Sequence, residues 1–242
     1  MELAGRAALV TGGAHRLGRA FVLALAEAGM DVAVHYNASH DAAQSTAADA
    51  NELGIRAIPI QADLSQAGAC DPLIEEATAA LGGLDVLVNS ASLFESAPVE
   101  EISAADWDRV MGLNLRAPFL LSQAAVPYLR EGGGAIVNIV DLSAFQAWPA
   151  FAHHAVAKAG LVHLTKVLAR ALAPTIRVNA IAPGTVLPPP DWDGTDNAGG
   201  RERRVTARAG RPQDAADALL YLLRGDFTTG QTLVLDGGRM LL

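Results

Sequence analysis

Cysteine is nearly absent from this chain, which has only Cys70 among its 242 residues. One cysteine can form neither an intramolecular disulfide nor a thiolate metal cluster, and such sparing use suits a reducing compartment. Long apolar runs are missing too, since no stretch reaches the roughly 18 consecutive apolar residues of a transmembrane helix. The N-terminal segment also lacks the apolar core of a signal peptide. These absences predict a cytoplasmic protein with no membrane partner.

Basic residues are scarce relative to acidic ones. The chain has 18 Lys and Arg against 26 Asp and Glu, a net charge of −8. Because nucleic-acid binders concentrate Lys and Arg to neutralise phosphates, this balance argues against a nucleic-acid partner. The six histidines show no metal-ligand spacing, so we expect no metal site. A small molecule is the expected partner.

Apolar residues are plentiful, at 51% of the chain. Short apolar runs alternate with longer amphipathic segments, which predicts one α/β domain over residues 1–242, a doubly wound parallel sheet with helices on both faces. The seven expected strands are Ala7–Val10, Val32–His35, Ala57–Gln61, Val86–Asn89, Ala135–Ile139, Arg177–Ile181 and Thr232–Leu235. The expected helices are Leu17–Ala28, Asp41–Leu53, Cys70–Leu81, Ala104–Leu129, Ala152–Leu172 and Asp214–Leu223.

Residues 187–210 interrupt this alternation. The segment is rich in Pro, Gly and charged residues and has no clear hydrophobic period. Long stretches of this composition are typical of mobile loops at functional sites. We expect 187–210 to be a mobile substrate loop.

A glycine turn follows the first expected strand, with the sequence Thr11-Gly12-Gly13-Ala14-His15-Arg16-Leu17-Gly18. Strand, glycine turn and helix in succession form the Rossmann arrangement, in which free N–H groups and the helix N-terminus stabilise a pyrophosphate. A tight turn without any ligand is the alternative interpretation of this motif alone. The cofactor contacts expected in this turn are Gly12, His15, Arg16, Leu17 and Gly18.

The end of the second expected strand indicates which dinucleotide binds. Proteins that prefer NAD usually carry Asp or Glu there, to bind the ribose 2′-hydroxyl. This chain has no carboxylate between Val32 and His40, which admits a 2′-phosphate and favours NADPH (NADP) as cofactor. Arg16 is positioned to supply charge, although an arginine in this turn can equally face solvent. The strand-end contacts expected are His35, Tyr36, Asn37 and Ser39.

Several further motifs stand in the order found in the short-chain dehydrogenase/reductase family, which the chain resembles over essentially its whole length. Gln61-Ala62-Asp63-Leu64 is similar to the family's acidic motif, which implies that Asp63 and Leu64 contact the adenine. Asn89-Ser90-Ala91-Ser92 resembles its NNAG motif and implies cofactor contacts from Asn89, Ala91 and Ser92. The resemblance also implies an active-site asparagine at Asn114, a turn over the nicotinamide at Pro183-Gly184 and a C-terminal signature at Leu235-Asp236-Gly237-Gly238.

Three departures from the usual family pattern resemble the pteridine reductases and dihydromonapterin reductases. Arg16 stands where the family's TGxxxGxG turn has its middle glycine, Ser92 ends the NNAS variant, and Asp141 replaces the usual Ser. Phe94 occupies the position from which that subgroup stacks a ring on a pterin. Simple packing of Phe94 in a loop is the alternative. The resemblance implies a substrate site formed by Arg16, Ser92, Phe94, Asp141 and His154, for a substrate such as a dihydropterin. It also implies a homotetramer or homodimer.

One further departure from the family pattern lies among the catalytic positions. Lys158 matches the family lysine, but His154 stands where the family has Tyr, thirteen positions after Asp141. A neutral imidazole is a very weak acid, so proton donation needs the imidazolium. Lys158 disfavours that form, whereas a nearby Asp141 favours it. Either His154 donates the proton, or Asp141 or a water does so while His154 positions it; Asn114 and Lys158 complete the expected catalytic set.

Three functions fit these residues. The first is NADPH-dependent reduction of a pterin or similar flat heterocycle. The second is reduction of an ordinary ketone or hydroxy compound, as in most of the family. The third is a dinucleotide-binding sensor or structural subunit that has lost catalysis, because the Tyr is replaced by His154.

Overall fold

Seven parallel strands form the centre of the computed structural model, which describes residues 1–186, 205–206 and 208–242. The strands are β1 (Ala7–Val10), β2 (Asp31–Tyr36), β3 (Ala57–Gln61), β4 (Val86–Asn89), β5 (Ala135–Ile139), β6 (Arg177–Pro183) and β7 (Thr232–Leu235). Their order in the sheet is β3-β2-β1-β4-β5-β6-β7, and every neighbouring pair is parallel. The predicted sheet is confirmed, with β2 and β6 longer than expected. The predicted loop 187–210 lies almost entirely outside the described residues.

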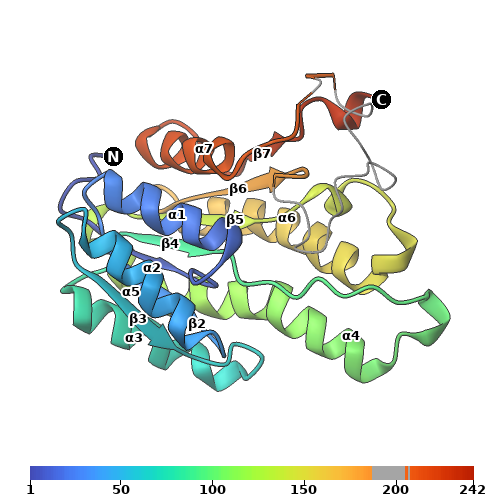
Figure 1. Cartoon of the computed structure of the whole chain (residues 1–242), viewed down its shortest axis with the longest axis horizontal. Coiled ribbons are helices and arrows are strands. Elements are labelled where there is room, and N and C mark those ends of the chain that lie inside the picture. The colour runs from blue at the N-terminus through green and yellow to red at the C-terminus, as the bar shows by residue number, and fades with distance from the viewer. Residues whose placement is uncertain (187–204, 207) are drawn as a thin grey trace.

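The helices cover both faces of this sheet (Figure 1). They are α1 (Arg16–Glu27), α2 (His40–Asn51), α3 (Cys70–Leu81), α4 (Ala104–Met111), α5 (Ala117–Gly132), α6 (Ala152–Leu172) and α7 (Pro212–Arg224). Helices α1, α2 and α7 contribute to the core on one face, and α3, α5 and α6 to the core on the other. None of the helices within the described ranges has the length and apolarity to cross a membrane.

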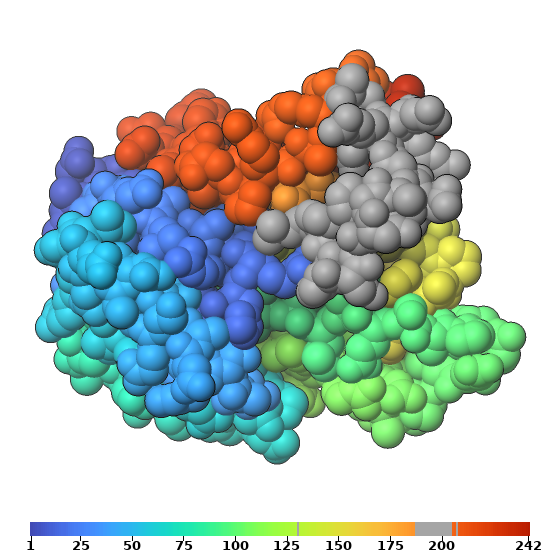
Figure 2. Space-filling model, in the orientation of Figure 1, coloured from blue at the N-terminus to red at the C-terminus, as the bar shows by residue number. Residues whose placement is uncertain are grey.

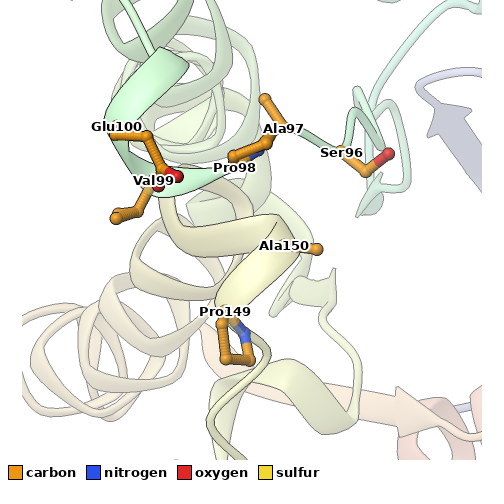
Figure 3. A pocket seen from close by; sticks show the side chains of 7 residues that line it. All are labelled: Ser96, Ala97, Pro98, Val99, Glu100, Pro149 and Ala150. Atoms are coloured by element: carbon orange, nitrogen blue, oxygen red, sulfur yellow. The ribbon is translucent and has the colours of Figure 1, made fainter.

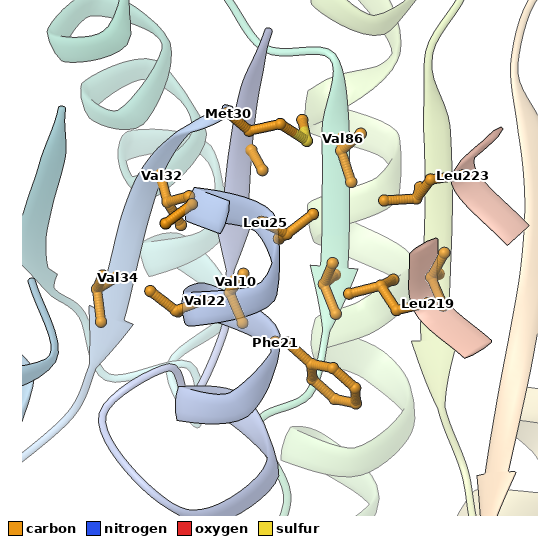
Figure 4. Packing of buried hydrophobic residues seen from close by; sticks show 14 of the residues in the cluster. Val10, Phe21, Val22, Leu25, Met30, Val32, Val34, Val86, Leu219 and Leu223 are labelled. Carbon is orange, nitrogen blue, oxygen red and sulfur yellow. The ribbon is translucent and has the colours of Figure 1, made fainter. Parts of the chain in front are cut away.

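The core under α1 shows why this arrangement is stable. Phe21, Val22 and Leu25 recur on one side of the helix and are fully buried. They pack against valines of β1, β2 and β4, while Leu219 and Leu223 of α7 fill the neighbouring space (Figure 4). Because burial of an aromatic or aliphatic side chain contributes about 1.5–3 kcal/mol, these contacts fix α1 and the turn that precedes it onto the sheet.

One predicted helix is not a continuous α-helix in the structure. The segment expected as a single helix over Ala104–Leu129 is α4 and α5 joined by a π-helical turn at Gly112–Arg116. The wider turn inserts an extra residue into the helical repeat, which rotates its side chains relative to a regular α-helix. Asn114 lies within this turn and is fully buried. Amphipathic periodicity did not reveal this local change of pitch.

Strand order reverses between β1 and β4, which are adjacent although β2 and β3 separate them in sequence. At such a reversal the following connections leave toward opposite faces and open a crevice beyond the carboxyl ends of the strands. The glycine turn after β1, the loop after β4 and the loop after β5 all begin at this edge. The fold therefore brings together the segments that contain the predicted cofactor and catalytic residues.

Gly18 provides a test of the close packing at this edge. A Cβ at Gly18 would overlap the carbonyl oxygen of Gly12, whereas a Cβ at Gly83 meets no atom within 4 Å. We expect Gly18→Ala to lower the free energy of unfolding by roughly 1–3 kcal/mol, as for other overpacked sites, and to weaken NADPH binding. Thermal unfolding and cofactor titration measure both effects. Gly83→Ala is the matched control, and equal behaviour of the two variants would contradict the packing argument.

Candidate active site

The glycine turn is held from beneath by His35, which is buried in β2. The N–H of Gly12 donates to His35 Nδ1 at 3.0 Å, and His35 Nε2 donates to the carbonyl of Ala62 at 3.0 Å. Burial lowers the pKa of His35 to about 4, although the Ala62 carbonyl partly opposes this shift. His35 is thus neutral at physiological pH, and its place is under the turn, where it positions Gly12.

Arg16, in the glycine turn, has a left-handed backbone conformation. Its φ is 49°, the one positive φ of a non-glycine residue in the described part of the chain. The left-handed conformation costs roughly 1–2 kcal/mol for a residue with a Cβ. Such strain is retained mainly at functional sites. Arg16 begins α1, and the preceding N-cap residue His15 makes no side-chain cap hydrogen bond.

Polar side chains lie at the end of β2, and none of those from Tyr36 to His40 is a carboxylate. Tyr36 is half-buried and its hydroxyl lies 2.8 Å from His40 Nδ1, while Asn37 is exposed. The side chain of Gln61 donates to the Asn37 carbonyl at 3.1 Å and fixes the strand end. Asp63 caps the following turn by accepting from the N–H of Ser65, and hydrogen bonds from Ser65 lower its pKa.

The end of β4 is tied to its neighbours by hydrogen bonds. The Thr11 hydroxyl accepts the N–H groups of Ser90 and Ala91 at 2.9 and 3.0 Å. Asn89 is buried, and its amide donates to Asn138 Oδ1 on β5 at 2.9 Å. The Asn89 side chain therefore links β4 to β5. The Thr11 hydroxyl holds the backbone that follows β4 at Ser90 and Ala91.

Asp141 and His154 form a hydrogen-bonded pair at the end of β5. His154 Nε2 lies 2.6 Å from Asp141 Oδ2, and the other carboxylate oxygen accepts from the N–H and hydroxyl of Ser143. The His154 side chain is 2% exposed and that of Asp141 is 22% exposed. Burial raises the pKa of Asp141, but His154, Lys158 and Ser143 together outweigh it and lower the pKa. Asp141 is consequently an anion that is partly exposed to solvent, whereas its hydrogen-bond partner His154 is buried.

Asn114 and the backbone of Leu93 hold the other side of His154. The Asn114 amide accepts from Leu93 N–H at 2.8 Å and donates to the Leu93 carbonyl at 2.9 Å. His154 Nδ1 lies 2.9 Å from that carbonyl and 3.2 Å from Asn114 Nδ2. The ring can therefore donate to Leu93 when Nδ1 carries a proton, or accept from Asn114 when it does not. No residue type in the sequence signalled this contact, because it uses a backbone carbonyl.

Lys158 lies one helical turn after His154 on α6 and is buried. Its ammonium donates to the carbonyl of Ile139 at 2.8 Å. Burial lowers the pKa of Lys158 to about 8, with Asp141 opposing the shift. A buried ammonium with one backbone partner retains two further N–H donors for a ligand.

Phe94 forms the outer wall of the site beside His154. Its ring stacks on Phe151 at 4.4 Å with an interplanar angle of 17°, and it meets His154 edge-on at 4.8 Å. Trp148 packs edge-on against both phenylalanines at 6.5 and 6.1 Å. Phe94 remains 58% exposed. Phe151 and Trp148 thus support the Phe94 ring, part of which stays exposed to solvent. The sequence did not predict this arrangement, because Phe151 and Trp148 come from another loop.

An open cavity of about 370 Å³ lies between the two loops that contain these aromatic residues. Segment 96–100 forms one side, and Pro149 and Ala150 form the other (Figure 3). The N–H of Ala97 donates to the Ala150 carbonyl at 2.9 Å and links the two loops. In the surface view, the green surface from around residue 100 and the yellow surface from around residue 150 adjoin at the right-hand edge (Figure 2).

Comparison with known proteins defines the class to which this fold and site belong. The family model described as enoyl-(acyl carrier protein) reductase matches residues 12–239. A 3-oxoacyl-[acyl-carrier-protein] reductase of Staphylococcus aureus is 35% identical over 243 residues, which cover 96% of this chain and 97% of that protein. The chain belongs to the short-chain dehydrogenase/reductase family.

Two solved structures are similar over nearly the full length. A dehydrogenase/reductase from Sinorhizobium meliloti 1021 is 40% identical with a TM-score of 0.91, covering 98% of this chain and 97% of that one. FolM alternative dihydrofolate reductase 1 from Brucella canis, complexed with NADP, is 36% identical with a TM-score of 0.91, covering 100% and 97%. The predicted Rossmann fold agrees with both structures, and the predicted NADP cofactor agrees with the second, which is complexed with NADP.

The burial of neutral His35 predicts a pH dependence of stability. Its pKa in the folded chain is below its ordinary value of 6.5, so the stability that it contributes is present above pH 6.5 and is lost as the pH falls through about 4. The shift corresponds to about 3 kcal/mol of unfolding free energy. Denaturant unfolding between pH 7 and 4 measures it. We expect His35→Leu to lose that part of the acid dependence, and an unchanged dependence would contradict this role.

Proposed function

We propose that the protein is an NADPH-dependent reductase that transfers hydride to a C=N bond of a pterin or similar flat heterocycle. One observation carries this proposal: the exposed Phe94 ring, backed by Phe151, stands beside the Asp141–His154 pair. A planar ring stacks on an aromatic face, and a carboxylate next to that face can bind or protonate a ring nitrogen. The similarity to the Brucella canis alternative dihydrofolate reductase supports the same substrate class.

The residues present fit NADPH. The turn at Gly12 and the uncapped start of α1 suit a pyrophosphate, and the end of β2 has no carboxylate to repel a 2′-phosphate. Tyr36, Asn37 and Ser39 would lie near that phosphate, and Asp63 near the adenine. Lys158 would hold the nicotinamide ribose through its remaining N–H donors, and Pro183-Gly184 would cover the nicotinamide. The cofactor, when bound, supplies the hydride.

The proton comes to the substrate through Asp141, because Asp141 reaches the solvent-accessible side and His154 does not. With a proton on both ring nitrogens, His154 would donate through Nε2 to Asp141 and through Nδ1 to the Leu93 carbonyl. As the substrate carbon accepts hydride, the Nε2 proton of His154 moves to the Asp141 carboxylate, and the carboxyl group so formed gives a proton to the neighbouring nitrogen. Asp141 is then again an anion, and His154 is left as the neutral imidazole. Solvent at the exposed edge of Asp141 then restores the proton. His154, which stands where the family has Tyr, thus supplies the proton that Asp141 donates.

Reduction of a ketone is the second candidate. The similarity to a 3-oxoacyl-[acyl-carrier-protein] reductase favours it, and a carbonyl oxygen beside Asp141 would accept the same proton. A C=O group does not need the flat surface of Phe94, which is why the heterocycle is preferred. A sensor without turnover remains the alternative from another class.

We also propose a homotetramer or homodimer. Side chains of α4, the π-helical turn, α5 and α6 line an open surface groove of about 700 Å³, including Met111, Leu115, Phe119, Leu164 and Val167. Phe119 and Val167 are 41% and 49% exposed. Adjacent exposed apolar side chains of this kind are typical of an interface between subunits.

The central test follows NADPH oxidation by absorbance, with 7,8-dihydrobiopterin and a 3-oxoacyl thioester as substrates. We expect turnover of the pterin and a loss of kcat of about 10²–10⁴-fold in Asp141→Asn, the range for general acid catalysis. His154→Gln should lower kcat less and alter its pH dependence, because Gln can hydrogen-bond to Asp141 without supplying a proton. His154→Tyr tests whether the usual family residue can also work beside Asp141.

His153→Gln is the matched control, since His153 is equally buried and makes no contact with Asp141 among the described hydrogen bonds. Wild-type kcat and pH profile in His154→Gln would remove His154 from the proton path. Turnover of the thioester alone would establish the ketone reductase. Tight NADPH binding without turnover of either substrate would establish the sensor.

The pKa of Lys158 predicts the alkaline limit of activity. Because burial lowers it to about 8, the ammonium loses its proton as the pH rises through that value. The binding of the ribose and the stabilisation of the Asp141 anion then weaken, so kcat/KM for NADPH should fall above pH 8. Lys158→Arg should extend the plateau if its activity survives, because arginine stays protonated. A wild-type plateau that continues to pH 10 would refute the assignment.

A further inference from the structure

The C-terminal turn of the chain, η7 (Arg239–Leu241), is anchored to the strand that ends over the proposed nicotinamide site. The N–H of Gly184 donates to the Leu235 carbonyl at 2.8 Å, which joins the end of β6 to β7. The two oxygens of the Asp236 carboxylate accept the N–H groups of Gly238 and Met240, each at 2.8 Å. The position of Arg239 is therefore set relative to the active site.

The Arg239 side chain extends from this turn to the aromatic wall. Its guanidinium carbon lies 6.0 Å from the centroid of the Trp148 ring. Trp148 in turn packs against Phe94, whose ring meets His154. From the catalytic pair outward, the order is His154, Phe94, Trp148 and then Arg239. A cation thus stands at the outer end of the surface on which the substrate ring would lie.

The charge of Arg239 has no carboxylate partner in the part of the chain that the structure describes. Its sequence neighbour Asp236 is engaged by backbone N–H groups, as above. Glu95, next to Phe94, pairs with Arg109 at 2.5 Å, and Asp141 pairs with His154. The chain has a net charge of −8, and Arg239 contacts a tryptophan ring and none of the acidic side chains that the structure describes. Such an arginine can bind an external anion.

We propose that Arg239 determines specificity by binding an anionic group, a carboxylate or a phosphate, on a side chain of the substrate ring. This rests on the proposed function, which it deepens: the substrate is a flat heterocycle with an acidic tail. The ring lies on Phe94 with its reacting bond beside Asp141, and the tail extends past Trp148 to Arg239. Arg239 contacts only the tail, so it affects KM and leaves the chemical step unchanged.

The test compares three probes that share one ring: 7,8-dihydrobiopterin with a neutral tail, 7,8-dihydrofolate with carboxylates, and 7,8-dihydroneopterin monophosphate. We expect Arg239→Gln to raise KM for an anionic probe by about tenfold or more, the usual effect of one lost charge-assisted hydrogen bond, at unchanged kcat. KM for dihydrobiopterin should not change, and Arg239→Lys should recover part of the loss. The anionic probe that responds more strongly identifies the tail. Arg224→Gln, an exposed arginine at the end of α7, is the matched control.

Equal changes for neutral and anionic probes, or no change for any, would overturn the role of Arg239. If no pterin is reduced, the proposed function fails, and equilibrium binding of the same probes to the NADP⁺-loaded protein still tests Arg239. Quenching of tryptophan fluorescence measures this binding. A selective loss of anion affinity in Arg239→Gln would uphold the inference independently of turnover, and equal affinities for all three probes would overturn it.

Discussion

Reversal of the strand order between β1 and β4 is the constraint on which the active site depends. It places the ends of β1, β4 and β5 next to one another, although the segments between them are long. The hydroxyl of Thr11 at the end of β1 accepts both N–H groups that follow β4, so the glycine turn and the Phe94 loop cannot move apart freely. His35 supports the same turn from β2. The cofactor and substrate sites thus share one set of backbone hydrogen bonds.

The proposed acid–base pair, Asp141 and His154, differs in the exposure of its two members. His154 is enclosed by Asp141, Asn114 and the Leu93 carbonyl, whereas Asp141 has access to solvent. In the proposed function, His154 therefore acts through Asp141 and does not itself contact the substrate. The partly exposed carboxylate and the buried imidazole form one hydrogen-bonded unit. The replacement at position 154 and the aspartate at position 141 are therefore best understood together.

Much of the fold could be predicted because it depends on local patterns. Apolar strand runs, the glycine turn and the missing carboxylate after β2 are all visible in the sequence, and the sheet confirmed the seven expected strands. The π-helical turn at Gly112–Arg116 was not predicted, because one extra residue per turn barely disturbs an amphipathic pattern. The support of Phe94 by Phe151 was not predictable either, since the two residues come from different loops.

The sequence by itself determined the class of fold, the dinucleotide turn and the identity of the residues at positions 141, 154 and 158. Only the tertiary structure decided which of those side chains is accessible, and it placed Asp141 in front of His154. It also brought Arg239, from the end of the chain, to Trp148. The physical reason is that periodicity and motif spacing record neighbours along one element, whereas burial and hydrogen-bond partners arise where separate elements meet.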